Sequence, residues 1–347
     1  MKALLHTRPY EFEYTEYPDP DIGPDDVLVR VEAVGICGSD VHGYTGETGR
    51  RIPPVIMGHE AAGTVEAVGS RVSGIAAGDR VCFDSTVYCN ACAACRAGAF
   101  NRCERRQVLG VSVPDMPRRH GCMAEFVTVP EWTVHSMPEG LSFREAALLE
   151  PVSIALHAAR RGQISNDDVA LVIGCGTIGL FLIQAVRLEG ARRVIASDPD
   201  KSRLDLARRL GADVTVNPRA DDLITIVKDE TDGAGVDVSF EAVGFSATLL
   251  EAIAAARTGG RIVLVGNLTP KIELDVPHII SQELSLIGTY ASGGEYRDAI
   301  GLVTSGKLDV GTLISDVVPL SEGQRAFDRL YRGESGLVKI ILEPNGA

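Results

Sequence analysis

The chain has 347 residues, which at about 100–200 residues per domain predicts two or three domains and a sizeable core. Its 34 Lys and Arg against 47 Asp and Glu give a formal net charge of −13, which argues against a nucleic-acid backbone or an anionic membrane as the main partner. A hydrophobic content of 45% with 23% charged residues excludes a disordered chain. The apolar runs are shorter than the ~18–20 residues of a membrane span. The N-terminus becomes acidic too early for a signal peptide, so we expect a cytoplasmic protein with reduced thiols.

The first 151 residues have the pattern of a β-rich domain. They hold eleven of the seventeen prolines, and their short apolar runs are bounded by Gly, Pro or Asp. Such runs are typical of strands in a loop-rich β domain. The predicted strands are residues 25–35, 60–69, 78–83 and 124–130.

Four cysteines stand out in this first part, in the stretch STVYCNACAACRAGAFNRC. Cys89, Cys92, Cys95 and Cys103 fall within fifteen residues, and in a reducing compartment this clustering predicts metal binding rather than disulfides. Four thiolates suit a tetrahedral Zn²⁺ with no open position, which is a structural site. Iron–sulfur clusters also use four cysteines. We favour a structural zinc.

A second set of possible ligands is scattered along the chain. Cys37 lies in GICGSDVHGY, His59 and Glu60 lie in MGHEAAG, and Glu150 lies in ALLEPVS. Taken singly, Cys37 could be a core thiol, His59 a loop histidine with its hydrogen bonds satisfied, and Glu150 a helix-end carboxylate. Together they offer one thiolate, one imidazole and up to two carboxylates, the mixture that a catalytic zinc uses when it keeps one position open.

From about residue 168, short β-branched runs alternate with stretches of helical periodicity. This alternation predicts an α/β domain with a doubly wound, parallel, six-stranded Rossmann sheet, and the continuously apolar runs fit strands buried on both faces. The predicted strands are residues 169–174, 192–198, 214–218, 236–244, 261–266 and 284–290. The remaining tail, with helices at 295–308 and 321–333 and a strand at 337–344, is too short for a domain and is expected to pack on the first.

A glycine motif follows the first of these strands. Gly174, Gly176 and Gly179 form GxGxxG between a predicted strand and helix, the setting in which a pyrophosphate meets a helix N-terminus. Asp198 follows nineteen residues after the last glycine, at the end of the second strand. A carboxylate there binds the adenosine ribose and repels a 2′-phosphate, so we expect NAD rather than NADP. Asp198 could also serve only as a turn former before Pro199.

The segments GICGSDVH, GHE, the four-cysteine stretch, EPVSIALHA and GCGTIG, in this order, resemble the zinc-containing medium-chain alcohol dehydrogenases. The similarity is greatest to the polyol branch, with sorbitol, xylitol, threonine and phosphorylated-hexitol dehydrogenases, and it covers essentially the whole chain. It implies a GroES-like, β-rich catalytic domain made of residues 1–155 and 291–347, with an NAD-binding Rossmann domain at 156–290.

The resemblance also implies roles for the scattered set. Cys37, His59 and a glutamate would hold a catalytic zinc, and the choice between Glu60 and Glu150 stays open. Asp40 would orient His59. Ser39 would touch the substrate oxygen and begin a proton relay with His42 as its outer member, although both could also be ordinary surface residues.

The resemblance assigns cofactor contacts too. Asp198 and Arg203 match adenosine-ribose contacts, and Ile178 matches a contact of the glycine motif. The nicotinamide side is expected to involve Val243, Val265, Gly266 and Tyr290.

Two departures from the sorbitol dehydrogenases leave the substrate open. They usually place a tyrosine directly after the motif histidine, where this chain has Gly43 followed by Tyr44. They also carry an Arg-Tyr pair that grips the polyol, which aligns with Ala291 and Ser292 here.

The implied function is oxidation of a secondary alcohol of a polyol or sugar alcohol to a ketone, with hydride transfer to NAD⁺ and two zinc ions per chain. The alternatives within the enzyme class are a threonine-type amino-alcohol dehydrogenase and a phosphorylated-hexitol dehydrogenase. Outside it are a catalytically silent zinc- and NAD-binding protein and a nucleic-acid zinc finger, for which only Arg96, Arg102, Arg105 and Arg106 lie beside the cysteines. We expect a homotetramer, with a dimer possible, and residues 284–290 as a candidate edge for pairing between subunits.

Overall fold

The computed structural model describes residues 1–112, 116 and 118–345, and the chain divides into two compact units. Unit 1 comprises Met1–Ser153 and Ser292–Ala347, and unit 2 comprises Ile154–Ala291. The first boundary falls inside helix α4 (Leu149–Arg161). Among the described residues, no helix combines the length and the apolar composition that a membrane crossing needs.

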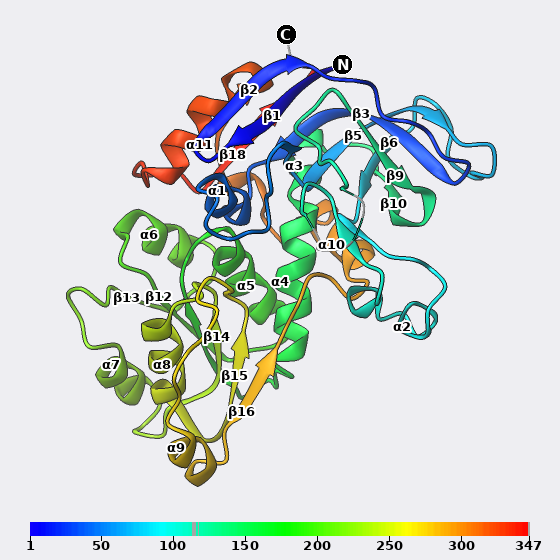
Figure 1. Ribbon diagram of the computed structural model, residues 1–347. Coiled ribbons are helices and arrows are strands. Elements are labelled where there is room, and N and C mark those ends of the chain that lie inside the picture. The colour runs from blue at the N-terminus through cyan, green and yellow to red at the C-terminus, as the bar shows by residue number, and fades with distance from the viewer. Residues whose placement is uncertain (113–115, 117, 346–347) are drawn as a thin grey trace. The chain divides into compact units, whose positions relative to one another are not determined.

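Unit 1 is built on a seven-stranded sheet of order β10-β6-β5-β3-β18-β17, with β9 also paired to β3 (Figure 1). A three-stranded sheet of order β2-β1-β4 and the pair β7-β8 complete its strands. The bounds are β1 (Lys2–Arg8), β2 (Glu11–Glu16), β3 (Asp26–Gly35), β4 (Val55–Ile56), β5 (Glu60–Val68), β6 (Arg80–Phe83), β7 (Thr86–Val87), β8 (Gln107–Val108), β9 (Phe126–Pro130), β10 (Val134–Ser136), β17 (Ile314–Pro319) and β18 (Lys339–Glu343). Its helices are α1 (Gly38–Tyr44), α2 (Ala93–Arg96), α3 (Phe143–Ala147), α10 (Tyr296–Thr304) and α11 (Gly323–Tyr331), with short 3₁₀ turns at Phe100–Arg102, Glu131–Thr133, Gly311–Leu313 and Leu320–Glu322.

The centre of this sheet explains why both chain ends belong to one unit. Strand β3 alternates buried and half-buried residues, as a strand with one face on a core should. Its last residues pair with β5 on one side and with β18 from the C-terminal segment on the other. The sequence pattern does not predict β17, because ISDVVP is a half-exposed edge strand without a continuous apolar run.

Unit 2 contains a six-stranded, wholly parallel sheet of order β13-β12-β11-β14-β15-β16. The predicted α/β class and the doubly wound six-stranded sheet are therefore confirmed. The strands are β11 (Val169–Ile173), β12 (Arg193–Ser197), β13 (Val214–Val216), β14 (Val236–Glu241), β15 (Ala256–Leu264) and β16 (Ser285–Gly288). The helices are α5 (Thr177–Leu188), α6 (Lys201–Arg209), α7 (Leu223–Glu230), α8 (Ser246–Ala255) and α9 (Val276–Ser281). Strand β11 is buried throughout and lies between β12 and β14, the point at which the strand order reverses.

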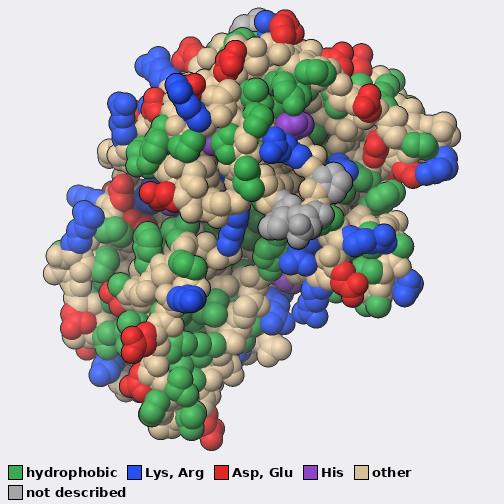
Figure 2. All heavy atoms as spheres, viewed as in Figure 1, with side chains coloured by type: hydrophobic (Ala, Val, Ile, Leu, Met, Phe, Trp, Pro, Cys, Tyr) green, Lys and Arg blue, Asp and Glu red, His purple; other side chains and the backbone are tan. Residues whose placement is uncertain are grey.

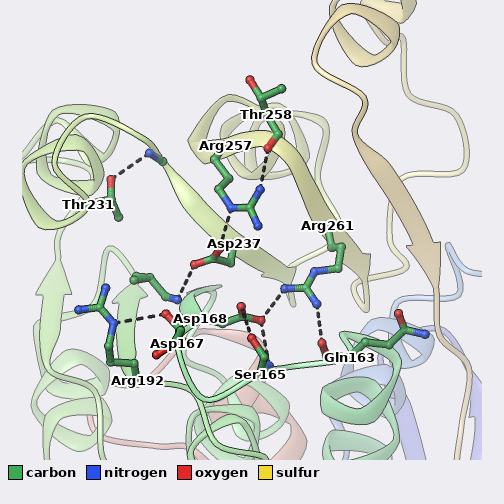
Figure 3. A network of polar contacts seen from close by, with 12 residues as sticks. Gln163, Ser165, Asp167, Asp168, Arg192, Thr231, Asp237, Arg257, Thr258 and Arg261 are labelled. Carbon is green, nitrogen blue, oxygen red and sulfur yellow. Dashed lines mark hydrogen bonds and ion pairs between the residues drawn. The ribbon is translucent and has the colours of Figure 1, made fainter.

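The two ends of this sheet differ in chemistry. At the amino ends of the strands, Asp237 accepts hydrogen bonds from the Val169 N–H and from Arg257, while Asp168 pairs with Arg261 (Figure 3). These contacts tie neighbouring strands together. The carboxyl ends instead carry glycine-rich turns, which in an open α/β sheet form the ligand-binding edge.

Charged side chains of both signs are interspersed over the face of the molecule shown in Figure 2.

Candidate metal centres and dinucleotide-binding loop

The scattered ligand set converges on one place in unit 1. Ligand atoms of Cys37, His59 and Glu60 all lie within 4.8 Å of one another. Cys37 follows β3 and is the residue before α1, while His59 directly precedes Glu60, the first residue of β5. Antiparallel pairing places Gly35 opposite Glu60, and a Cβ at Gly35 would lie 2.2 Å from Glu60 Oε2. The glycine is therefore required for Glu60 to enter the site.

Glu150, the second residue of α4, lies outside this group of three but faces the same charges. Its Oε1 accepts a hydrogen bond of 2.8 Å from Ser85, whereas its buried Oε2 has no partner among the described residues. Burial raises the pKa of Glu150 to about 7, His59 lowers it and Glu60 raises it. A buried carboxylate oxygen without a partner costs about 1–3 kcal/mol, so this atom is suited to meet a cation.

Lys339 is a member of the cluster that the sequence reasoning missed. Its Nζ lies 2.6 Å and 2.9 Å from the two Glu60 oxygens and donates a 2.9 Å hydrogen bond to the Ile36 carbonyl. Lys339 and Glu60 are each only 1% exposed. Burial lowers the pKa of Lys339, but Glu60 and Cys37 together raise it above its usual value, so the ammonium form is favoured. The available signal was a lone lysine in the apolar strand LVKIILEP.

A second buried ion pair lies on the histidine side. Asp40, which is fully buried in α1, has Oδ2 at 3.4 Å from His59 Nδ1. Its Oδ1 accepts a hydrogen bond of 2.9 Å from Arg51 Nε. Burial would raise the pKa of Asp40, but His59 and Arg51 hold it well below its usual range. The predicted orienting role of Asp40 is geometrically possible, and Arg51, again missed from sequence, is its second partner.

Ser39 and His42 occupy exposed positions on α1. The Ser39 hydroxyl donates to Cys37 Sγ at 3.3 Å. Tyr44 cannot replace the tyrosine expected at position 43, because it is 1% exposed and its hydroxyl binds the Tyr10 carbonyl and Asp328.

The four cysteines also come together. Ligand atoms of Cys89, Cys92, Cys95 and Cys103 lie within 4.8 Å of one another, with 3.5 Å between the sulfurs of Cys92 and Cys95. The Ala91 backbone N–H, with help from Arg105, lowers the pKa of Cys89 to about 6. This thiolate-stabilising setting and the four-sulfur donor set fit a closed zinc site. The other thiols, Cys82, Cys122 and Cys175, are fully buried, and burial raises the pKa of each.

An aromatic contact anchors the segment of residues 88–103 that carries these cysteines, which we call the cysteine lobe. Tyr88 stacks on Phe100 with 4.3 Å between ring centroids. The Tyr88 hydroxyl donates to the Trp132 carbonyl, and the Trp132 indole N–H donates back to the Tyr88 carbonyl. These contacts hold a segment whose only regular structure is the short helix α2 and one 3₁₀ turn.

In unit 2, the glycine motif lies at the carboxyl end of β11. Gly174 has a φ of +94°, which favours glycine, and a Cβ at Gly179 would lie 1.7 Å from the Gly174 carbonyl oxygen. A Cβ at Gly176 would meet nothing within 4 Å. The first and third glycines thus serve the turn and the packing, while the second leaves open space at the N-terminus of the twelve-residue helix α5, as a pyrophosphate would need. Ile178 lies in the first turn of this helix, half-buried.

Asp198 directly follows β12, the neighbour of β11. It is 5% exposed, and its two oxygens accept backbone N–H groups of Cys175 and Asp200, each at 2.8 Å. Asp198 therefore shapes the glycine loop as well as the start of α6, where Arg203 is half-buried. A carboxylate oxygen has a second lone pair, so these bonds leave acceptor capacity for ribose hydroxyls.

The expected nicotinamide-side residues lie at the ends of β14 and β15. Val243 follows β14 and approaches Gly174, while Val265 and Gly266 follow β15 and donate to the Glu241 carbonyl. The Glu241 carboxylate, which sequence reasoning missed, accepts from the Val243 and Gly244 N–H groups and from Thr248. Its signal was an acid ending an apolar strand. Tyr290 lies two residues beyond the edge strand β16 and is 47% exposed.

Comparison with known proteins identifies the family of the chain. Residues 23–139 match the model of the alcohol dehydrogenase GroES-like domain, and residues 177–305 match the zinc-binding dehydrogenase model. The chain is 35% identical over 349 residues to sorbitol dehydrogenase of Bacillus subtilis (strain 168), covering 99% of this chain and 98% of that protein. The chain belongs to the zinc-binding alcohol dehydrogenase family.

Other members of this family are similarly close. D-arabitol-phosphate dehydrogenase of Enterococcus avium is 34% identical over 331 residues, covering 94% of this chain and 92% of that protein. A crystal structure of a zinc-binding dehydrogenase from Sinorhizobium meliloti 1021, bound to NADP, superposes with a TM-score of 0.89 at 32% identity, covering 99% of each chain. The family and its polyol branch are those that the sequence motifs resembled, so this prediction is confirmed.

Proposed function

We propose that this protein oxidises a secondary alcohol of a polyol or sugar alcohol to a ketone and transfers the hydride to NAD⁺. The observation that carries the proposal is the cluster of Cys37, His59 and Glu60 beside the exposed Ser39 hydroxyl. Glu150, whose buried Oε2 has no partner among the described residues, is the fourth candidate ligand. A soft, a borderline and a hard ligand with an accessible hydroxyl next to them suit catalytic zinc chemistry. A silent binding protein has no need of this arrangement.

Cys37, His59 and Glu150 would hold the catalytic zinc directly. Both Glu60 oxygens already accept from the Lys339 ammonium, whereas Glu150 Oε2 has no such partner among the described residues. Glu60 would stay beside the ion as a charged neighbour. Zinc content distinguishes the two carboxylates: Glu150→Ala should lose the catalytic ion, and Glu60→Gln should keep it.

Bound zinc supplies a Lewis acid that makes an alcohol hydroxyl more acidic. Ser39 would accept the proton of that hydroxyl and pass its own hydrogen outward, with His42 as the outer group of the relay. Asp40, whose Oδ2 lies 3.4 Å from His59 Nδ1, would orient the His59 ring. The protein thus supplies orientation, proton transfer and a buried charge balance, while the cofactor accepts the hydride.

The same proposal includes NAD as the cofactor. Asp198, next to the glycine loop, places a negative charge where the 2′-phosphate of NADP would lie. We expect KM for NAD⁺ to rise about 10-fold in Asp198→Ala and the preference over NADP⁺ to shrink, measured with both cofactors. Equal turnover of the unaltered protein with NADP⁺ would contradict this assignment.

Several finer points belong to the proposal. The cysteine lobe would hold a second, structural zinc through Cys89, Cys92, Cys95 and Cys103. All eight cysteines are free of disulfides, which suits the reducing cytoplasm.

Strand β16 is the half-exposed edge of its sheet, so the segment 284–290 could pair between subunits of a dimer or tetramer, which light scattering would measure.

The substrate class is tested with a panel of polyols, sugar phosphates, threonine and simple secondary alcohols, following NADH formation. The similar chains named above include a sorbitol and an arabitol-phosphate dehydrogenase, and a free polyol is the expected substrate. Ala291 and Ser292 offer no Arg-Tyr pair, and the Ser292 hydroxyl donates to Glu295 inside unit 1. Faster oxidation of threonine or of a phosphorylated hexitol would replace the polyol assignment.

A further inference from the structure

Arg51 is a buried arginine in the loop before β4. It is 5% exposed, and its guanidinium contacts two side chains of α1. Nε and Nη2 lie 2.9 Å and 2.8 Å from Asp40 Oδ1, and Nη2 donates a 3.0 Å hydrogen bond to Ser39 Oγ. One rigid group therefore holds two residues that in turn contact the ligands Cys37 and His59.

The chemistry of the guanidinium determines the direction of these bonds. Arginine only donates hydrogen bonds, so Ser39 Oγ must accept from Arg51 and use its own hydrogen elsewhere. In the structure that hydrogen is directed to Cys37 Sγ, toward the metal ligands. Without Arg51, the exposed serine would be free to populate its other staggered rotamers. The arginine thus holds the Ser39 oxygen beside Cys37, next to the proposed metal, and the outward transfer then requires the serine hydrogen to turn away from Cys37 Sγ.

Arg51 also holds Asp40, which is fully buried and whose two oxygens face different partners. Oδ1 meets Arg51 and Oδ2 meets His59. Since a metal-ligating histidine is neutral, Arg51 is the cation that balances this carboxylate. Loss of that cation would leave Asp40 free to turn away from His59.

The neighbouring glycine shows that the space for Arg51 is tight. A Cβ at Gly43 would lie 2.2 Å from Cγ and 3.0 Å from Cβ of Arg51. Gly43 is one helical turn from Ser39 on α1, so only a residue without a side chain lets the arginine stem pass beneath the helix.

We propose that Arg51 is a positioning residue for the alcohol oxidation, setting the Ser39 hydroxyl and, through Asp40, the His59 ring. Arg51 would act on Cys37 and His59 through Ser39 and Asp40, which contact them. The inference rests on the proposed function, but it also predicts metal affinity, which does not depend on the substrate.

The test compares Arg51→Met and Arg51→Lys with the adjacent exposed Arg50→Met as matched control. We expect Arg51→Met to weaken the catalytic metal about 10–100-fold in chelator competition, and to lower kcat by a similar factor, with KM for NAD⁺ unchanged. Arg51→Lys should recover part of both losses, because one ammonium keeps the charge but not the fork that reaches Ser39 and Asp40 together. Arg50→Met should behave like the unaltered protein.

Coupling to Ser39 separates positioning from general stability. If Arg51 acts through the serine, Arg51→Lys should lower kcat much less in a Ser39→Ala background than alone. Should Arg51→Met fail to fold, the milder Arg51→Lys carries the test, with retention of the lobe metal as proof of folding. Unchanged metal affinity and kcat in Arg51→Lys would overturn the proposal. Failure of the unaltered protein to oxidise any alcohol would overturn the proposed function alone, since metal affinity would still report on Arg51.

Discussion

The two metal-ligand clusters of unit 1 are built in opposite ways. The cysteine lobe takes its four thiols from fifteen consecutive residues on an irregular segment. The proposed catalytic cluster would take Cys37 from just before α1, His59 and Glu60 from the start of β5 and Glu150 from α4. The first is nearly complete within its own segment, whereas the second exists only when a sheet and a helix have assembled.

The supporting groups differ in the same way. Backbone N–H groups and an aromatic stack support the cysteines. Buried ion pairs support the catalytic cluster, with Lys339 on Glu60 and Arg51 on Asp40. Loss of the metal from the cysteine lobe should therefore affect mainly that segment. Removal of Lys339 or Arg51 instead leaves a buried carboxylate without its counter-charge.

The largest effect should come from the ligands themselves. Cys37→Ala should lower kcat/KM at least about 10,000-fold, some 5 kcal/mol, because it removes the Lewis acid, while the lobe metal remains. Cys92→Ala should instead lose the lobe metal and lower the melting temperature, while the catalytic metal remains. Metal analysis and steady-state kinetics measure both. Loss of the same single ion in both variants would remove the distinction between the two clusters.

A large effect on stability is expected at the ion pair of the catalytic cluster. Lys339→Met should destabilise the protein by about 3–5 kcal/mol, since Glu60 would remain buried without its partner. Adding Glu60→Gln should restore much of this loss, which thermal unfolding of the two single variants and the double variant would show. If the double variant is no more stable than Lys339→Met, the pair is not the source of the effect.

An intermediate effect concerns the buried Asp84, which directly follows β6. Burial raises the pKa of Asp84 to about 6, with a further rise from Glu295. The unfolded carboxyl titrates near 3.8, so the neutral form stabilises the fold fully below about pH 4, and this contribution is lost as the pH rises through 6. Asp84→Asn should therefore gain about 3 kcal/mol over the unaltered protein at pH 8 and almost nothing at pH 4. Melting temperatures that differ equally at both pH values would contradict this.

The smallest effect is expected at Ser85. Ser85→Ala removes the hydrogen bond to Glu150 Oε1 and should weaken the catalytic metal about 10-fold without changing the lobe metal. Thr86→Val, the next residue, serves as the control. Chelator competition at the two sites measures this difference. Equal weakening of metal binding at both sites would contradict the prediction, because Ser85 would then support both metals.

The sequence by itself determined the features that depend on local order. Three features were of this kind: four cysteines within fifteen residues, the strand–glycine–helix setting of Gly174 to Gly179, and the alternation of strands and helices. Each depends on residues that are close along the chain, so spacing and periodicity were enough to predict it. The α/β class and the parallel sheet follow from that alternation. The scattered set of Cys37, His59, Glu60 and Glu150 offered suitable donor types, but the assignment depended on the resemblance to a family, which left the choice between Glu60 and Glu150 open.

Only the tertiary structure decided what surrounds those ligands. Lys339 and Glu60 are 279 residues apart, and they meet because β18 and β5 flank β3 in one sheet. Arg51 reaches Ser39 and Asp40 because Gly43 leaves room for its stem. Tyr44, next to the expected tyrosine position, turns into the core. Such contacts depend on strand order, register and steric fit between distant segments, and neither periodicity nor spacing within a segment reports them.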